Sequence, residues 1–426
     1  MNHKKGIINI SPLIFFVVIY LATSILAGDF YTMPITIAFM FTCMYAIAIF
    51  RGKPLVDRIK TFCQGAGSAD IMQMLCIFVA AGAFANSAKA IGCINATVDF
   101  TLSILPSNMI LAGLFIATCF ISLSIGTSVG TIVALVPIGL GIAHSMGADP
   151  SLMTAIIVGG SFFGDNLSFI SDTTIVATNT QQCRQRDKFL VNSYTAIPAA
   201  VIAITLYICM GNVASTPDTI PSIDYIKVIP YLIVIGCAIA GVNVLVVLTL
   251  GMLSTGIIGM LCGDCNFFGW CKAMSEGVSG MGDLIIVAVL AGGLLRILSE
   301  NGALDYIIKI MTARIRNKRS CELTIGMLVA IVNVCTANNT VAILTVGNLS
   351  KKISDEYGVD NRKCASILDT FSCCVQSIIP YGAQILMASG LTALSPILII
   401  EHLYYPFLLF IISVVAIMLR YPKKYS

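Results

Sequence analysis

Residues 323–349 read LTIGMLVAIVNVCTANNTVAILTVGNL, in which two apolar runs flank the polar segment Asn333–Thr340. At about 1.5 Å of helix per residue, this stretch is too short to cross a bilayer of about 30 Å twice. It also lies between two clusters of positive charge, Arg314–Arg319 and Lys351–Lys352, which a single crossing would place on opposite sides. We therefore expect a re-entrant hairpin that enters and leaves the membrane on one side, with the polar segment at its tip.

The chain around this hairpin is strongly apolar. Of 426 residues, 57% are hydrophobic and 11% are charged, whereas a soluble domain carries about 25% charged residues. Apolar runs of about 20 residues, each long enough to cross the lipid bilayer, recur along the chain. We therefore expect an all-α polytopic membrane protein. The expected spans are Pro12–Ala27, Met33–Phe50, Asp70–Ala88, Leu152–Thr178, Phe189–Gly211, Val228–Ala240, Asn243–Cys262, Leu284–Leu298, Cys364–Ala388 and His402–Leu419, with a first interrupted stretch at Met109–Met146.

The lysines and arginines indicate how these spans are oriented. Cytoplasmic loops of membrane proteins carry an excess of positive charge. If both interrupted stretches enter and leave on one side, all of the 25 lysines and arginines except Lys89, Lys227 and Lys272 lie on the side of the N-terminus. This predicts that both termini are cytoplasmic, and it places Lys188 and Lys363 in the cytoplasmic segments. The first span is closely followed by the next, which favours a retained helix over a cleaved signal peptide.

The two halves of the sequence resemble each other at a spacing near 211 residues. The matching pairs are Gly65–Asp70 with Gly277–Asp283, Ala81-Gly82 with Gly292-Gly293, Ser122–Thr131 with Asn333–Thr340, and Ser168–Asp172 with Ser377–Tyr381. Each half then holds about five spans and one re-entrant hairpin, and the odd number of crossings inverts the second copy. We expect residues 1–211 and 228–426 to be inverted repeats, joined by an extracytoplasmic connector at 212–227.

Inverted repeats whose interrupted helices meet near the middle of the membrane are a recurring design of secondary transporters. Unwound backbone is tolerated at that depth only where it is buried in protein or lines a wet cavity. The tips of the two hairpins therefore mark the expected binding site.

Three aspartates lie inside expected spans. Asp165 and Asp172 are two helical turns apart in one segment, and Asp369 lies at the cytoplasmic end of the corresponding span of the second half. A charged side chain inside the bilayer costs about 2.5–3.5 kcal/mol on insertion scales, and such residues are usually functional. The alternative is that these aspartates cap helix breaks or pair with lysines and arginines near the surface.

Carboxylates together with hydroxyls, amides and free carbonyls suit a small hard cation. The expected ion- or substrate-binding residues are Asp165, Ser168, Ser171, Asp172, Thr173, Thr127, Ser128, Asn338, Asn339, Thr340, Asp369 and Ser377. Of these, Asp172, Asp165, Asn338, Asn339 and Thr340 are expected to hold Na⁺. No residue is expected to be catalytic.

Two motifs resemble those of the NhaC family of sodium/proton antiporters. Gly164-Asp165-Asn166-Leu167-Ser168-Phe169-Ile170-Ser171-Asp172-Thr173-Thr174 is similar to the family's G-D-K-L-S-P-L-S-D-T-T, and Ser377-Ile378-Ile379-Pro380-Tyr381 is similar to its S-P-L-I-P-W. The resemblance extends from about Gly65 to Ala388. Three departures fall within the expected site: Asn166 replaces a basic residue, Phe169 replaces a proline, and Gly382 stands where the family tends to have asparagine.

The resemblance implies a secondary transporter of a bacterial-type plasma (inner) membrane that exchanges Na⁺ for H⁺ by alternating access. The alternative on the same fold is a transporter or exchanger of a small organic anion or amino acid, coupled to Na⁺ or H⁺. The only ligands expected are Na⁺, H⁺ or such a solute, with no cofactor and no nucleic acid. The sequence leaves open whether the protein forms a homodimer.

An enzymatic function is not expected. Gly280-Met281-Gly282-Asp283 matches the Gly-x-Gly-Asp of intramembrane aspartyl proteases. That chemistry needs a partner aspartate, usually after tyrosine in a neighbouring span, and the sequence contains no Tyr-Asp pair.

Overall fold

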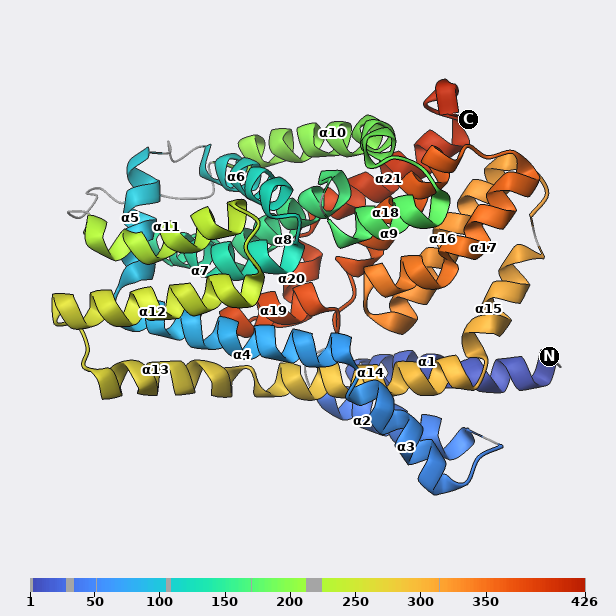
Figure 1. The fold of residues 1–426 in the computed structure, drawn as a ribbon, viewed down its shortest axis with the longest axis horizontal. Helices are drawn as coiled ribbons and strands as arrows, with labels where there is room; N and C mark the ends of the chain where they lie inside the picture. The colour runs from blue at the N-terminus through green and yellow to red at the C-terminus, as the bar shows by residue number, and fades with distance from the viewer. Residues whose placement is uncertain are drawn as a thin grey trace.

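The computed structural model describes residues 3–27, 34–50, 52–104, 109–169, 171–211, 224–313 and 315–425. Within these ranges the chain is helical, without a β-strand. Figure 1 shows the helices as an elongated bundle, with α11 and α12 near one end and α15, α16 and α17 near the other. The prediction of an all-α fold is therefore confirmed.

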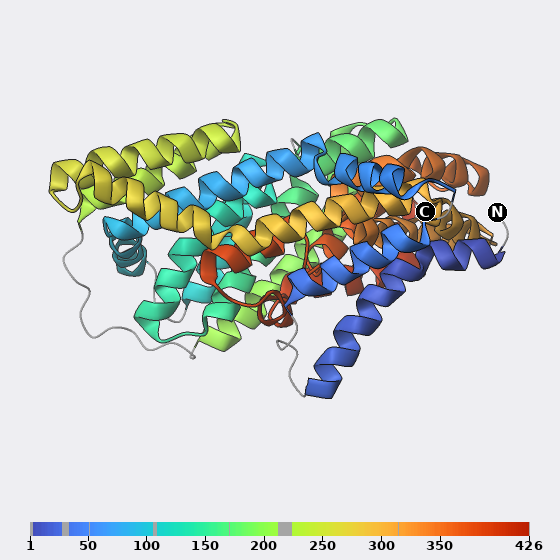
Figure 2. The same ribbon diagram turned by 90° about the horizontal axis from the view of Figure 1, so that it is seen from below.

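Ten helices are described in the first half of the chain. They are α1 (His3–Ala27), α2 (Ile35–Ile49), α3 (Leu55–Ala66), α4 (Ala69–Ala90), α5 (Cys93–Ile104), α6 (Ile110–Ile125), α7 (Ser128–Met146), α8 (Pro150–Leu167), α9 (Asp172–Gln181) and α10 (Gln185–Met210). In Figure 2 part of the dark blue α1 projects away from the bundle. The short helices α3 and α5 lie between the expected spans, where the sequence predicted none.

The second half follows the same order. Its helices are α11 (Tyr225–Ile239), α12 (Val244–Cys262), α13 (Phe267–Gly280), α14 (Gly282–Glu300), α15 (Ala303–Thr312), α16 (Lys318–Thr336), α17 (Asn339–Tyr357), α18 (Asn361–Gln376), α19 (Ala383–Thr392), α20 (Pro396–Glu401) and α21 (Tyr404–Met418). Most of the expected connector, 212–223, lies outside the described residues, but Tyr225–Lys227 already belong to α11 and not to a loop.

Seven segments in the described part of the chain are long and apolar enough to cross a membrane. They are 71–90, 128–146, 150–181, 185–210, 244–262, 282–300 and 318–336. Shorter apolar helices include most of α2, α6, α11 and α21. Many of their side chains are exposed on the outside of the bundle, for example Phe120 at 64% and Ile411 at 57%. Large exposed apolar side chains on helices of this length are typical of a surface that faces lipid.

The two interrupted stretches both form helical hairpins. Helix α6 packs against α7, and α16 packs against α17. The second hairpin is longer than its apolar sequence indicated, because α16 and α17 each contain 19 residues and extend into the flanking charged segments. At about 1.5 Å per residue each arm is about 28 Å long, so the argument that the stretch is too short to cross twice was wrong. The positive charges that flank the hairpin still favour entry and exit on one side, because they do not depend on its length.

Two expected spans are broken helices. Leu152–Thr178 divides into α8 and α9, which are separated at 168–171, and Cys364–Ala388 divides into α18 and α19, separated at 377–382. The first break is in the segment that contains Asp165 and Asp172. The second contains Pro380, which cannot donate a backbone hydrogen bond. Both breaks fall in the motifs that resemble the NhaC family.

Residues with a left-handed backbone occur in pairs at a nearly constant spacing. Five pairs are 210 or 211 residues apart: Gly52 with Gly263, Gly92 with Gly302, Gly126 with Ala337, Gly147 with Gly358, and Gln182 with Ala393. Among the described residues only Gly241 and Arg420 lack such a partner, and Gly241 corresponds to residue 30, which is not described. Because a left-handed residue ends a helix or turns the chain, the pairs show that the helices end at equivalent points in the two halves.

Helix contacts are also exchanged between the halves. Helix α3 packs on α14, and its counterpart α13 packs on α4. A Cβ on Gly65 would lie 2.4 Å from the carbonyl oxygen of Gly292, and a Cβ on Gly82 would lie 2.4 Å from that of Gly277. Figure 1 shows α4 running alongside α13. Each contact thus joins a glycine of one matching pair to a glycine of the other pair, and the two contacts are equivalent under the repeat.

Candidate functional site

The tip of the first hairpin is held by Asp165. One carboxylate oxygen of Asp165 accepts a hydrogen bond from the backbone N–H of Ser128 at 2.9 Å, and the other accepts from the Ser128 hydroxyl at 2.5 Å. Ser128 is the first residue of α7, and Gly126 before it has a left-handed φ of 72°. A carboxylate at the N-terminus of a helix is favoured by the unpaired N–H groups there. Asp165 thus caps the N-terminus of α7, as the alternative interpretation of the sequence predicted.

A chain of side-chain hydrogen bonds joins this tip to the tip of the second hairpin. Gln384 Nε2 donates to the Ser128 hydroxyl at 3.0 Å, and Gln376 Nε2 donates to Gln384 Oε1 at 2.9 Å. Gln376 Nε2 also donates to the carbonyl of Ala337 at 3.0 Å. Ala337 is the left-handed residue between α16 and α17. The two tips therefore lie at one place in the protein, with the glutamines of the second broken helix between them.

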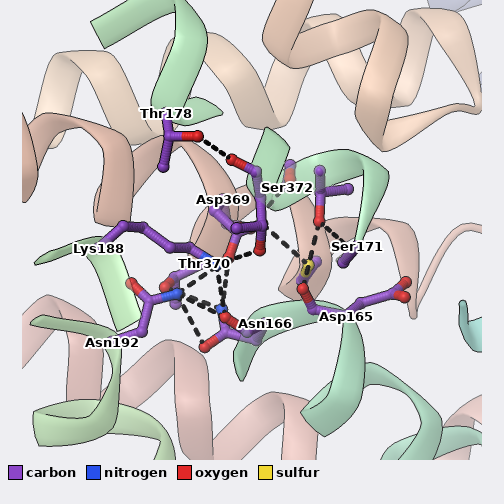
Figure 3. Close-up of polar contacts among 12 residues, drawn as sticks. Asp165, Asn166, Ser171, Thr178, Lys188, Asn192, Asp369, Thr370 and Ser372 are labelled. Atoms are coloured by element: carbon purple, nitrogen blue, oxygen red, sulfur yellow. Dashed lines mark hydrogen bonds and ion pairs between the residues drawn. The ribbon is translucent and has the colours of Figure 1, made fainter. Parts of the chain in front are cut away.

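A buried ion pair lies next to Asn166, apart from these hydrogen-bonded side chains. Lys188 Nζ on α10 is 2.6 Å from Asp369 Oδ2 on α18, and the side chains are 1% and 0% exposed. Figure 3 shows Lys188, Asn192 and Asn166 converging on Asp369, while the Asp165 carboxylate points away from it. Because a buried charge is costly unless it is paired and hydrogen-bonded, each of these two groups depends on the other.

Amides and hydroxyls complete the shell of this pair. Asn192 Nδ2 donates to Asp369 Oδ2 at 2.9 Å, and Asn166 Nδ2 lies 3.3 Å from the same oxygen and 3.0 Å from the Thr370 hydroxyl. Lys188 Nζ also donates to the Asn166 carbonyl at 2.6 Å and to the Thr174 hydroxyl at 2.7 Å. We call Asn166, Lys188, Asn192, Asp369 and Thr370 the central cluster.

The remaining predicted residues of the first broken helix lie around its opening. The Thr173 hydroxyl donates to the Asp165 carbonyl at 3.3 Å and lies 2.8 Å from the Ser171 hydroxyl, and both side chains are buried. The Ser168 hydroxyl donates to the Leu123 carbonyl at 3.1 Å. Thr127 precedes α7 without capping it through its side chain. These contacts bring Ser128, Asp165, Ser171 and Thr173 together.

Asp172 is the predicted residue that lies apart from the rest. It begins α9, and its side chain is exposed. Because the helix is broken between Leu167 and Asp172, the seven-residue spacing from Asp165 does not place the two carboxylates on one helix face. No hydrogen bond from the Asp172 side chain to another described residue is seen.

At the second tip, Asn338 caps α17 by accepting from the Val341 N–H at 3.0 Å. The Asn339 Oδ1 atom accepts from the Thr340 N–H at 3.1 Å, while its buried Nδ2 has no partner among the described residues. Ser377 is buried, and its hydroxyl donates to the Cys374 carbonyl at 2.7 Å within the end of α18. Asn338, Asn339 and Thr340 thus form the tip, and no hydrogen bond from them to Asp165 or Asp172 is seen in the described part of the chain.

Two lysines do not lie in the loops to which the sequence assigned them. Lys188 was placed in the cytoplasmic segment after the first broken helix, and Lys363 in the segment after the second hairpin. Both are buried, at 1% and 3% exposure. Asp369 is likewise fully buried. Each lysine lies in the first turn of its helix. A positive charge near a helix end is usually solvated, so the hydropathy pattern wrongly predicted that both lysines are exposed.

Sequence reasoning also missed Asn192, Gln376 and Gln384. An amide side chain within an apolar helix is weak evidence for a functional site, because it costs less free energy to bury than a charge does. Their position is informative only after the broken helices are recognised, since Gln376 ends α18 and Gln384 begins α19. At the internal spacing of about 211 residues, Gln376 is the counterpart of Asp165. This alignment could have identified Gln376 as a candidate site residue.

The site offers oxygen ligands that have no donors. Asn192 Oδ1, Gln376 Oε1 and Asn333 Oδ1 are buried and have no hydrogen-bond partner among the described residues. No group of three or more histidines, cysteines or acidic residues gathers in the described chain. The donor set is therefore carboxylate, amide and hydroxyl oxygen, which suits a hard monovalent cation better than a transition metal.

Comparison with known proteins agrees with this architecture. The model of the Na⁺/H⁺ antiporter family matches residues 6–212 and 213–423. The chain is 25% identical to the Na(+)/H(+) antiporter NhaC of Bacillus subtilis, over 87% of each chain. It is 21% identical to NhaC of Alkalihalophilus pseudofirmus, over 78% of each chain. It is also 21% identical to the malate-2H(+)/Na(+)-lactate antiporter of Bacillus subtilis, over 84% of this chain and 83% of the relative.

The matches to the family model together span nearly the whole chain, including both broken helices and both hairpins. The predicted resemblance to NhaC antiporters is confirmed. The protein is a multi-pass membrane protein that belongs to the Na⁺/H⁺ antiporter family.

Proposed function

We propose that this protein exchanges Na⁺ for H⁺ across the membrane, with the ions bound between the two hairpin tips and the central cluster. The observation that carries the proposal is the hydrogen-bonded chain from Asp165 through Ser128, Gln384 and Gln376 to Ala337. It joins two interrupted hairpins at a place that also holds a buried carboxylate. Unwound backbone and buried acids in a membrane protein are expected where ions bind.

Exchange requires that one site take either ion but not both. The carboxylates of Asp165 and Asp369 are the charges that Na⁺ or a proton would neutralise. The unpartnered oxygens of Asn192, Gln376 and Asn333 are the neutral ligands that would complete the shell of the cation. Asn338, Asn339 and Thr340 would contribute through the second tip, and the exposed Asp172 would attract cations to the opening of the first broken helix.

Lys188 supplies a positive charge that balances the Asp369 carboxylate during the exchange. Its ammonium holds Asp369 at 2.6 Å. A Na⁺ that binds to Asp369 would have to replace part of this interaction, and Asp369 protonation would weaken it. The buried pair would therefore differ between the Na⁺-bound and proton-bound states, which is what a transporter needs in order to change conformation with its load.

We further propose that residues 1–211 and 228–426 are inverted repeats joined by an extracytoplasmic connector, with both termini in the cytoplasm of a bacterial-type plasma membrane. The paired left-handed residues and the exchanged glycine contacts support the repeat. So does a pair of hydrogen bonds: Ser122 donates to the Ser161 carbonyl, and 211 residues later Asn333 donates to the Ser372 carbonyl. Alternating access would follow from relative motion of the two copies around the shared site.

The test is Na⁺-driven proton movement in everted membrane vesicles. With an imposed pH gradient, added Na⁺ should dissipate the gradient when the protein is present. Asp165→Asn, Asp369→Asn and Asp172→Asn should each reduce or remove the response, whereas Asp283→Asn, at an exposed position outside the site, should not. The absence of Na⁺-dependent proton movement at every pH from about 6 to 9 would contradict the proposal. Counterflow of an organic solute in the same preparation would favour the alternative instead.

A further inference from the structure

A second buried ion pair lies outside the central cluster and joins the beginning of α18 to that of α16. Lys363 Nζ on α18 is 3.5 Å from Glu322 Oε2 on α16, and the side chains are 4% and 3% exposed. Lys363 Nζ also donates to the Tyr421 carbonyl at 3.0 Å, close to the C-terminus. Both residues are near the beginning of their helices, at the end of the bundle where the positive charges gather. Nothing in the ion site described above uses this pair.

A small cavity lies between Lys363 of this pair and Thr370 of the central cluster. It has a volume of about 20 Å³ and lies between α10, α18 and α21. Its polar lining consists of Thr195, Lys363, Ser366, Thr370 and Ser413. This is room for about one water molecule. The Ser413 hydroxyl is buried and has no partner among the described residues, as expected if a water completes its hydrogen bonding.

The lining residues on α18 form one stripe along the helix. Lys363, Ser366 and Thr370 are spaced by three and four residues, so they share a face and cover about 10 Å of helix. At the inner end of this stripe the Thr370 hydroxyl accepts a hydrogen bond from Asn166, which belongs to the central cluster. At the outer end is the Lys363–Glu322 pair. The cavity thus shares Thr370 with the central cluster and Lys363 with the second pair.

The first half of the chain lacks this polar stripe at the equivalent positions. Residues 211 positions before Lys363, Ser366 and Thr370 are Leu152, Ala155 and Gly159, and the position equivalent to Glu322 is Leu111. Leu111 and Leu152 are buried, and α6 packs on α8 as α16 packs on α18. Equivalent helix pairs therefore carry two leucines in one half and an ion pair in the other. The packing of these helices thus does not require the charges.

We propose that this cavity is a proton path, in which one water passes protons between the Lys363–Glu322 pair and the central cluster. The proposal rests on the Na⁺/H⁺ exchange proposed above. In the inward step, the Lys363 ammonium gives a proton to the water, and the water passes one of its own to the Thr370 hydroxyl. The proton of that hydroxyl then moves to the Asp369 carboxylate, which shares the Asn166 amide with it. One N–H or O–H bond breaks for each O–H bond that forms. Solvent at the C-terminal end then returns a proton to Lys363.

The charges around Lys363 suit a path for protons rather than for Na⁺. Glu322 is its counter-ion, and the positive charges of Arg420 after α21 and of Lys318 on the same helix also act on that carboxylate. These two cations and the Lys363 ammonium oppose the entrance of a metal cation by charge, while hopping of a proton needs no vacant ligand shell. Glu322 acts through Lys363 and is a positioning residue. Na⁺ would reach the tips by another route.

The experiment compares two activities of the full-length protein in proteoliposomes. Exchange of radioactive Na⁺ for Na⁺ needs no proton, whereas Na⁺-driven proton movement does. The variant Glu322→Leu/Lys363→Leu carries the residues of the first half and should fold. We expect its proton movement to be at least about tenfold slower than that of the unaltered protein, with Na⁺/Na⁺ exchange within about twofold. Lys272→Gln/Glu276→Gln, which removes an exposed pair on α13, is the control and should change neither rate.

A second variant tests the water without touching a charge. Ser413→Val should fill the cavity and slow proton movement at least about fivefold, and Ser413→Ala, which leaves the space open, should slow it less. Proton movement at the unaltered rate in both Glu322→Leu/Lys363→Leu and Ser413→Val would overturn the proton path. If the unaltered protein moves no protons in response to Na⁺, the proposed function itself fails, and the two failures are thus distinguished.

Discussion

Lys188 and Asp369 form their ion pair at positions whose counterparts in the other half are Ile399 and Val158. All four residues are fully or almost fully buried, and α20 packs on α8 as α10 packs on α18. Both helix pairs join the two halves, and two buried apolar residues occupy in one pair the positions that two charges occupy in the other. Since the apolar version already supports the packing, the charged version is best explained by function.

Removing one member of the pair should be worse than removing both. Lys188→Ile leaves a buried carboxylate without its cation and Asp369→Val leaves a buried ammonium, and each should cost about 3–5 kcal/mol of stability. The double variant carries the residues of the other half and should recover most of that loss while abolishing Na⁺-driven proton movement. Thermal unfolding in detergent measures the first effect and vesicle assays the second. A double variant less stable than either single one would contradict this account.

Exchanging residues 166 and 188 tests whether the lysine can act from either position. The motif that Asn166 interrupts carries a basic residue there, and Lys188 Nζ lies 2.6 Å from the carbonyl of Asn166. Lys188→Asn should inactivate exchange, and adding Asn166→Lys should restore part of it, because a lysine at 166 would again place an ammonium beside Asp369. Restoration is measured as the rate of Na⁺-driven proton movement. If the double variant is as inactive as Lys188→Asn alone, the two positions are not interchangeable.

The sequence predicted the helices, and it indicated a candidate site, from the order of apolar and polar residues along the chain. Apolar runs gave the spans, and Asp165 with Ser128 and Thr173 emerged from a polar segment in an apolar context. The internal spacing located both hairpin tips. These signals work because a membrane forces backbone groups to bond within each helix, so that any interruption stands out.

What could not be predicted depends on contacts between distant segments. Lys188 appears in a charged stretch that begins with Arg184, and only the packing of α10 on α18 shows that its side chain turns inward. Asp172 looks equivalent to Asp165 in the sequence, but the break between them separates the two side chains. The short helices α3, α5, α13 and α15 lie beside the spans, and their sequences are too short or too polar to be recognised by hydropathy.

The cap of α18 supports a prediction about pH. Arg362 donates to both carboxylate oxygens of Asp360, at 2.9 and 2.5 Å, and these hydrogen bonds hold the pKa of Asp360 below its ordinary value. A carboxyl group whose pKa is lower in the folded state stabilises the fold above its unfolded pKa, near 3.9, and loses that contribution as the pH falls through the folded value. Because Asp360 is partly exposed, the effect should be below about 1 kcal/mol.

Asp360→Asn should therefore lower the thermal stability slightly at pH 7, and the difference should shrink as the pH falls below about 3.9. Unfolding followed in detergent across this range measures the change. Asp355→Asn, which removes an exposed carboxylate from a pair with Lys351, is a suitable comparison because its side chain is 55% exposed. A stability difference for Asp360→Asn that grows as the pH falls would contradict the assignment.

The glycine contacts between the halves predict a position-specific effect on folding. A Cβ at residue 277 would lie 2.0 Å from the Gly82 carbonyl oxygen, closer than any relaxed contact, so Gly277→Ala must separate α13 from α4. Small residues let membrane helices approach closely, and overpacking typically costs about 1–3 kcal/mol. Gly280→Ala is the matched control, because it lies one turn further on the same helix with open space around it. Gly277→Ala should reduce the yield of monodisperse protein and its melting temperature, and Gly280→Ala should change neither. Gly65→Ala, which meets the Gly292 carbonyl in the equivalent contact, should behave like Gly277→Ala, since the two contacts occupy the same place in the two halves.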